Sequence, residues 1–339
     1  MPSLPSPRGP LSDALISALG DRPGTLDDPP VTPPADPLGD DDLHLALYVL
    51  YELHYRGFDG VDERWEWDGG ALALRGRLET VFERGLRDAL AGWTPPRTTP
   101  ETMDIALRAV LDEDDGPSLA RRLEVLGTVE QVHEFLIHRS AYQLKEADPH
   151  SWAIPRLSGP AKAALVEIQA DEYGGGDPGR VHAQLFADAM DAVGLDPAYG
   201  AYLDVLPGVT LATVNLMSLF GLHRRLRAAI VGHLALFEMS SSIPNRRYAN
   251  ALRRLGFDDP RATRFFDEHV TADAVHENVA AIDLAGGLVR QDPALADEVL
   301  FGARALVEID ARWAAHVLAA WDEDRSSLVA AATIREAMA

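Results

Sequence analysis

The 339-residue sequence contains no cysteine, which excludes disulfides, thiolate catalysis, thiolate-bound iron–sulfur clusters and cysteine-type zinc sites. Any metal must therefore be held by histidine, aspartate or glutamate. Basic residues are also few, with 31 Lys and Arg against 53 Asp and Glu and a net charge of −22. Because no cluster of basic residues offsets phosphate repulsion, we expect no nucleic acid or membrane partner.

Long hydrophobic runs are absent as well. The apolar stretch around Ala228–Phe237 is interrupted by His233 and is shorter than the ~20 residues that span a bilayer. The N-terminus has no basic segment followed by an apolar one, so nothing marks it for export. These features predict a soluble cytoplasmic protein.

Proline is concentrated at the N-terminus, where residues 1–40 hold ten of the 23 prolines. This composition favours a mobile arm that contributes little core, with one short helix at Leu11–Leu19 that could dock on the body or on a second subunit. Residues 41–339 are expected to form one all-α domain, because apolar residues recur at helical spacing and strand patterns are nearly absent. The predicted helices are 41–56, 70–93, 100–112, 116–147 with a break near Gly127, 158–173, 178–194, 207–241 with a break near Gly221, 244–256, 261–289, and 293–337 with a break near Trp321.

The most informative motif is His269-x3-Asp273-x2-His276 within the helix predicted over 261–289. Offsets of 0, 4 and 7 residues place the three side chains within an arc of about 60° on one helix face. Two imidazoles and a carboxylate suit Fe(II), Mn(II) or Zn(II). The alternative is a polar helix face without a metal.

Two further segments carry candidate ligands. Glu172 ends one helix and His182 begins another, and the glycines between them let both side chains reach one cavity, although they could instead flank a surface corner. In the preceding helix, Glu146 lies near the C-terminus, where a carboxylate is unfavourable without a positive partner. Glu134 and His138, four residues apart, are a competing pair, and these observations alone do not decide between it and Glu146.

The order of these residues resembles the haem-oxygenase-like diiron oxidases and oxygenases, often labelled iron-containing redox enzymes. In that family one helix gives a Glu, a second region gives a Glu and a His about ten residues later, and a third helix gives His-x3-Asp-x2-His. The segment Leu47–Phe58 also resembles the N-terminal helix of some members, so the likeness covers about residues 41–290. Six positions match in order: Glu146, Glu172, His182, His269, Asp273 and His276.

The resemblance implies a haem-oxygenase-like helical bundle, two Fe(II) ions and O2 as co-substrate, and it favours Glu146 over Glu134. It further implies N-oxygenation of an amine, guanidine or aminoheterocycle, with an external electron donor, a reductase as its source, and a homodimer as the expected assembly. Oxidative decarboxylation, desaturation or C–C cleavage is the alternative within the family. Haem degradation by the shared fold, with His44 or His54 as the ligand, and a non-enzymatic helical binding protein are weaker alternatives. Glu238 is expected either to contact a charged substrate or to face solvent.

Overall fold

The structure is a computed structural model that describes residues 1–27, 29–114 and 116–329, and the side chains of residues 272–275 also lie outside the description. The described residues form helices and connecting turns without a strand. The helices are α1 (Pro10–Leu19), α2 (Asp41–Glu52), α3 (Gly69–Ala89), α4 (Met103–Asp112), α5 (Leu119–Leu126), α6 (Val129–Gln143), α7 (Asp148–Ser151), α8 (Gly159–Glu172), α9 (His182–Ala192), α10 (Gly208–Leu222), α11 (Arg227–Arg254), α12 (Arg261–Asn278), the π-helix η8 (Val279–Gly286), α13 (Gly287–Gln291) and α14 (Ala296–Asp322). The all-α helical bundle is confirmed. None of the described helices combines the length and hydrophobicity needed to cross a membrane.

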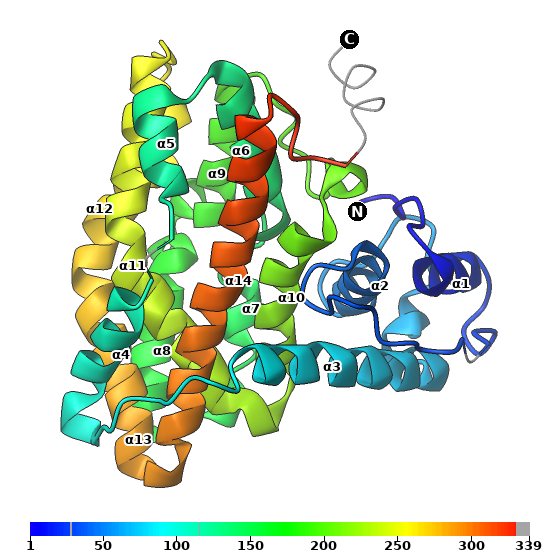
Figure 1. Cartoon of the computed structure of the whole chain (residues 1–339), viewed down its shortest axis with the longest axis horizontal. Helices are drawn as coiled ribbons and strands as arrows, with labels where there is room; N and C mark the ends of the chain where they lie inside the picture. Colours follow the sequence, from blue (N-terminus) through cyan, green and yellow to red (C-terminus); the bar gives the residue numbers. More distant parts are fainter. Residues whose placement is uncertain (28, 115, 330–339) are drawn as a thin grey trace.

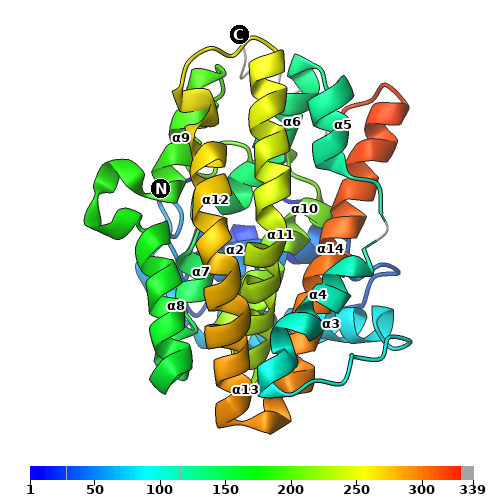
Figure 2. The ribbon, with the colours of Figure 1, turned by 90° about the vertical axis from the view of Figure 1, so that its left-hand side faces the viewer.

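Helix α11 is the central element of the bundle. It packs against α12 on one side and α14 on the other, with α8 and α9 beyond α12 (Figure 2). Glycines allow α11 and α14 to approach closely, because a Cβ on Gly232 would lie 1.8 Å from the carbonyl oxygen of Val299, and one on Gly302 would lie 2.0 Å from that of Ala229. Side chains on the α8, α9 and α12 side of α11 can therefore meet in the interior.

The N-terminal segment lies beside the bundle with α2 and α3 (Figure 1). The helix predicted at Leu11–Leu19 is present as α1, and Leu11, Leu15 and Leu19 are buried against the body. The expectation that this segment adds little to the core was therefore wrong, since three leucines on one helix face supply apolar surface that the proline count obscured. The mobility of residues 1–40 and the domain boundary at residue 40 stay predictions.

Several predicted helix boundaries differ from the observed ones. The break predicted near Gly221 is confirmed, since α10 ends at Leu222. The separation of 207–241 from 244–256 was wrong, because α11 continues through Pro244 to Arg254. Proline removes one backbone donor, but the packing of α11 on both flanks outweighs that loss. The break near Gly127 is confirmed, and α14 ends at Asp322, next to Trp321. The predicted extension to residue 337 lies in part outside the described residues.

Candidate metal centre

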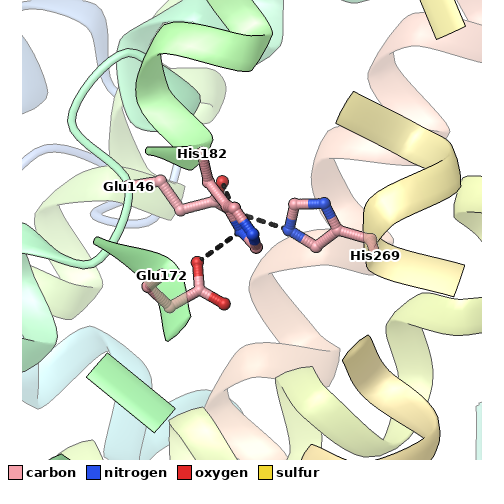
Figure 3. A group of neighbouring side chains, drawn as sticks. All are labelled: Glu146, Glu172, His182 and His269. Atoms are coloured by element: carbon pink, nitrogen blue, oxygen red, sulfur yellow. Dashed lines mark ion pairs between the residues drawn. The ribbon is translucent and has the colours of Figure 1, made fainter. Parts of the chain in front are cut away.

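Four predicted ligands meet in the interior between the α6–α7 turn, α8, α9 and α12. Glu146, Glu172, His182 and His269 are all buried, and each offers a ligand atom within 4.8 Å of the others. Figure 3 shows the two carboxylates and two imidazoles converging from separate elements. Glu172 Oε2 lies 2.8 Å from His182 Nδ1, and Glu146 Oε1 lies 3.5 Å from His269 Nε2.

A second group of candidate ligands shares one residue with the first. Glu172, Glu238 and His276 also offer ligand atoms within 4.8 Å of one another, and all three are buried. His276 Nδ1 lies 3.4 Å from Glu238 Oε2. Glu172 therefore stands between two sets of oxygen and nitrogen donors. Asp273 lies on α12 between His269 and His276, but its side chain lies outside the described residues, so its role as a ligand stays a prediction.

Glu238 is the site residue that the sequence interpretation missed as a ligand. It lies on α11 near the end of the apolar run that begins at Ala228, and its side chain is buried rather than facing solvent. A single carboxylate within a buried apolar helix segment is the sequence signal that could have identified it, because an isolated buried charge requires a partner.

Hydrogen bonds outside the ligand groups orient two of the histidines. Nδ1 of His269 donates to the carbonyl oxygen of Phe265 at 2.8 Å, which directs Nε2 toward Glu146. Nε2 of His276 lies 3.0 Å from Asp171 Oδ2, which directs Nδ1 toward Glu238. A histidine that gives its second ring N–H to a carbonyl or carboxylate is typical of metal ligands, because this fixes the tautomer and the ring orientation.

In the absence of a metal, electrostatic attraction between the buried carboxylates and imidazoles shifts the pKa values of Glu172 and His276. Burial alone would raise the pKa of Glu172, but the imidazoles of His182, His269 and His276 outweigh it and lower the pKa. Burial alone would lower the pKa of His276, but Glu238, Asp171 and Glu172 raise it to about 9. These carboxylates therefore favour positive charge in the site, which is what a bound cation supplies.

The chemistry of the donor set fits a metal. Oε2 of Glu146 is buried without a hydrogen-bond partner among the described residues, and a buried carboxylate oxygen in that state is suited to a cation. Carboxylate oxygens and imidazole nitrogens are the ligands preferred by iron, manganese and zinc in cysteine-free sites.

The competing pair Glu134 and His138 serves another purpose. Glu134 Oε2 accepts hydrogen bonds from Trp321 Nε1 at 2.9 Å and from the backbone N–H of Ser327 at 3.0 Å. His138 Nε2 lies 2.9 Å from Ser327 Oγ. Both residues thus hold the segment after α14 against α6, and they are absent from the two ligand groups found among the described side chains. The choice of Glu146 agrees with this arrangement.

A small buried cavity adjoins the ligands. Its lining includes the candidate ligands Glu146, Glu172, Glu238 and His269 together with Tyr142, His150, Leu234 and Phe237. Its free space corresponds to about one water-sized molecule. The cluster is thus shielded from bulk solvent by aromatic and aliphatic side chains.

Comparisons with known proteins support the helical-bundle fold. The sequence model of a family described as iron-containing redox enzyme matches residues 133–311, a range that holds every candidate ligand. The nitrosourea synthase of Streptomyces achromogenes subsp. streptozoticus is 31% identical over 137 residues, which are 40% of this chain and 29% of that protein. The chain thus matches less than a third of the length of this curated relative. The matched family range covers more than half of the chain, and the chain belongs to the family of iron-containing redox enzymes.

Proposed function

We propose that the chain is a non-haem diiron oxygenase. The observation that carries this proposal is the shared position of Glu172, which belongs to both groups of buried ligand atoms. A carboxylate between two donor sets is suited to bridge two metal ions, which lie about 3.5–4 Å apart in two-metal sites. Family membership supports iron as the metal.

The ligand sets divide naturally into two. Glu146, His182 and His269 would hold one Fe(II) with Glu172, and Glu238 and His276 would hold the second with Glu172. Asp273, placed by its spacing on the same face of α12, is proposed as a further ligand. The four carboxylates together carry −4 and would balance the +4 of two Fe(II) ions.

When bound by these residues, two Fe(II) ions would supply the electrons for O2 activation, a chemistry that no side chain performs alone. The residues of the chain would exclude water and orient the ligands. Tyr142, Leu234 and Phe237, which line the cavity beside the ligands, would exclude water from it. The carbonyl oxygen of Phe265 and the carboxylate of Asp171 keep the two α12 histidines in the tautomers that expose their ligating nitrogens.

For the reaction, we propose N-oxygenation of an amine, guanidine or aminoheterocycle. The similarity to a nitrosourea synthase supports this choice, because a nitrosourea contains a nitrogen–oxygen bond. Turnover would require an external electron donor delivered by a reductase. A small-molecule substrate and a homodimeric assembly belong to the same proposal.

The test uses purified protein loaded with Fe(II), a panel of amines and guanidines, isotopically labelled O2 and a chemical reductant. Mass spectrometry of the products is expected to show labelled oxygen attached to nitrogen. Loss of carbon dioxide or of two hydrogens without labelled oxygen would instead establish a decarboxylase or desaturase and refute N-oxygenation.

A further inference from the structure

Glu146 is carried by an irregular turn between α6 and α7 rather than by a helix. The turn, residues 144–147, includes Ala147 with a φ of 73°, a left-handed conformation that non-glycine residues rarely adopt. Such a conformation persists only where the surroundings enforce it. Among the described residues, the ion-pair contacts of the Glu146 carboxylate are long, 3.5 Å to His269 and 4.0 Å to His182. The contacts that hold the turn therefore help to set the position of Glu146.

A buried ion pair holds the turn at Lys145. Nζ of Lys145, the residue before Glu146, donates to Glu52 Oε2 of α2 at 2.9 Å. The Lys145 and Glu52 side chains are 1% and 0% exposed. The ammonium group also lies 4.7 Å from the ring centre of Tyr48 and 4.3 Å from that of Tyr55. Because burying two charges is costly, such a pair is retained only with close geometry and additional hydrogen bonds.

Those additional hydrogen bonds are present on both carboxylate oxygens of Glu52. The Tyr199 hydroxyl donates to Oε2 at 2.6 Å, and the backbone N–H of Arg56 donates to Oε1 at 3.3 Å. The Arg56 guanidinium stacks on the Tyr199 ring and donates to the carbonyl oxygen of Leu144, the first residue of the turn, at 3.1 Å. The C-terminal end of α2 is thereby connected to the turn at two consecutive residues, Leu144 and Lys145.

The other face of the turn is held by α8. Nε2 of Gln169 donates to the carbonyl oxygen of Ala147 at 2.8 Å and to Ser151 Oγ at 2.8 Å. Gln169 lies one helical turn before Glu172, so the same helix carries a ligand and supports the turn that carries another. The turn is clamped between α2 and α8.

We propose that the buried Glu52–Lys145 ion pair is a positioning device for the metal ligand Glu146, and that α2 thus sets the metal affinity of a site to which it contributes no ligand. The inference rests on the proposed function, because it requires Glu146 to bind a metal. Adjacent residues of the turn share one peptide unit, so a displaced Lys145 displaces the Glu146 backbone. Loss of the ion pair lets the turn relax from the strained Ala147 conformation and moves the Glu146 carboxylate away from the other ligands.

The test is anaerobic titration of the full metal-free chain with Fe(II) alone, together with chemical unfolding of the same metal-free samples. Glu52→Gln is expected to weaken binding of at least one Fe(II) by about tenfold or more, the effect typical of residues that orient metal ligands. Glu134→Gln is the matched control, because it alters a partly buried carboxylate that accepts hydrogen bonds from Trp321 and Ser327 and belongs to neither ligand group. The control is expected to lower stability without lowering Fe(II) affinity.

Tyr199→Phe is the second variant, since it removes one hydrogen bond to Glu52 and keeps the ring under Arg56. It is expected to fold and to weaken Fe(II) binding in the same direction by a smaller factor, and it decides the matter if Glu52→Gln does not fold. Wild-type affinity in the folded variants, or an equal loss of affinity in Glu134→Gln, would overturn the positioning role alone. A wild-type chain that binds no Fe(II) would overturn the proposed function as well.

Discussion

The Glu238 side chain is buried and its Oε2 lies 3.4 Å from His276 Nδ1, so in the proposed site it would hold the second metal. Glu238→Gln replaces a charged ligand by a neutral amide of the same shape, which binds Fe(II) poorly. We expect bound iron to fall from about two ions to about one per chain, because the donor set around Glu146 and His182 remains. Iron analysis after anaerobic loading measures this number.

The control for this variant is Glu268→Gln on α12, whose carboxylate is partly exposed and lies 3.8 Å from Arg180. It removes the same charge near the site without touching a ligand, and iron binding should be unchanged. Retention of two ions by Glu238→Gln would show that Glu238 is not a ligand.

In the proposed site, Asp171 would act on the metal through His276. Its carboxylate, which is 63% exposed, accepts from the ring nitrogen that faces away from Glu238. Asp171→Ala removes that hydrogen bond, and we expect about 10- to 100-fold weaker binding of one Fe(II). Competition with a coloured Fe(II) chelator measures the change. An affinity equal to that of the wild type would mean that other contacts fix the His276 ring.

The sequence motifs and the family resemblance named candidate ligands, and the structure brings five of them, Glu146, Glu172, His182, His269 and His276, into the two buried groups. The sequence did not identify Glu238 as a candidate ligand, and it did not identify Asp171 as the hydrogen-bond partner of His276. Glu238 stands alone on its helix and meets its partners only through the packing of α11 against α12. Asp171 adjoins Glu172 in sequence, but its partner His276 lies 105 residues away. Such long-range pairings depend on tertiary structure and leave no local spacing to recognise.

At the scale of the helices, the crossing of α11 and α14 holds the interior together. Gly232→Ala places a methyl group where a Cβ would lie 1.8 Å from the Val299 carbonyl oxygen, so the helices must separate. We expect a loss of about 3 kcal/mol in the free energy of unfolding, the upper end for overpacked sites. Urea unfolding of the metal-free protein tests this value.

Gly76→Ala is the matched control, because Gly76 lies on the exposed face of α3 and a Cβ there meets nothing within 4 Å. This change should raise stability by about 0.5–1 kcal/mol through higher helix propensity. If both alanine variants were equally stable, the close crossing of α11 and α14 would be refuted.

The helical spacing of apolar residues predicted where most helices lie, but it did not predict where one helix continues without a break. The apolar pattern placed α2, α3 and α8 close to their observed bounds because each has one buried face and flanking turn residues. It divided α11 at Pro244, because local propensity opposes a proline in a helix interior. The packing of α11 against α12 and α14 keeps the helix continuous through Pro244, and a short stretch of sequence does not reveal that packing. The π-helix η8, which directly follows the His269–His276 stretch, likewise had no local signal.

For the whole molecule, buried neutral histidines make stability depend on pH. Burial lowers the pKa of His44 to about 4, of His138 to about 3 and of His150 to about 4, from 6.5 in the unfolded chain. Between pH 6.5 and about 4 the unfolded chain binds protons that the folded chain does not. The stabilisation is therefore complete above pH 6.5 and is lost as the pH falls toward 4, by on the order of 1 kcal/mol per pH unit for each histidine.

His138→Gln tests this account, because glutamine can still bond Thr210 and Ser327 but does not titrate. Urea unfolding of the metal-free variant between about pH 7 and pH 5 should show a shallower fall in stability than the wild type, by about one proton's contribution. Parallel pH dependences for the two proteins would contradict the assignment of a buried neutral His138.

In the proposed site one buried carboxylate, Glu172, joins two metal positions, and anaerobic Fe(II) titration of the wild type and of Glu172→Ala tests this arrangement. We expect about two Fe(II) ions per chain in the wild type. Binding of both ions should be weakened in Glu172→Ala, in contrast to the single ion lost with Glu238→Gln. A wild-type chain that binds one Fe(II) or none, or a Glu172→Ala chain that loses only one, would contradict the shared site.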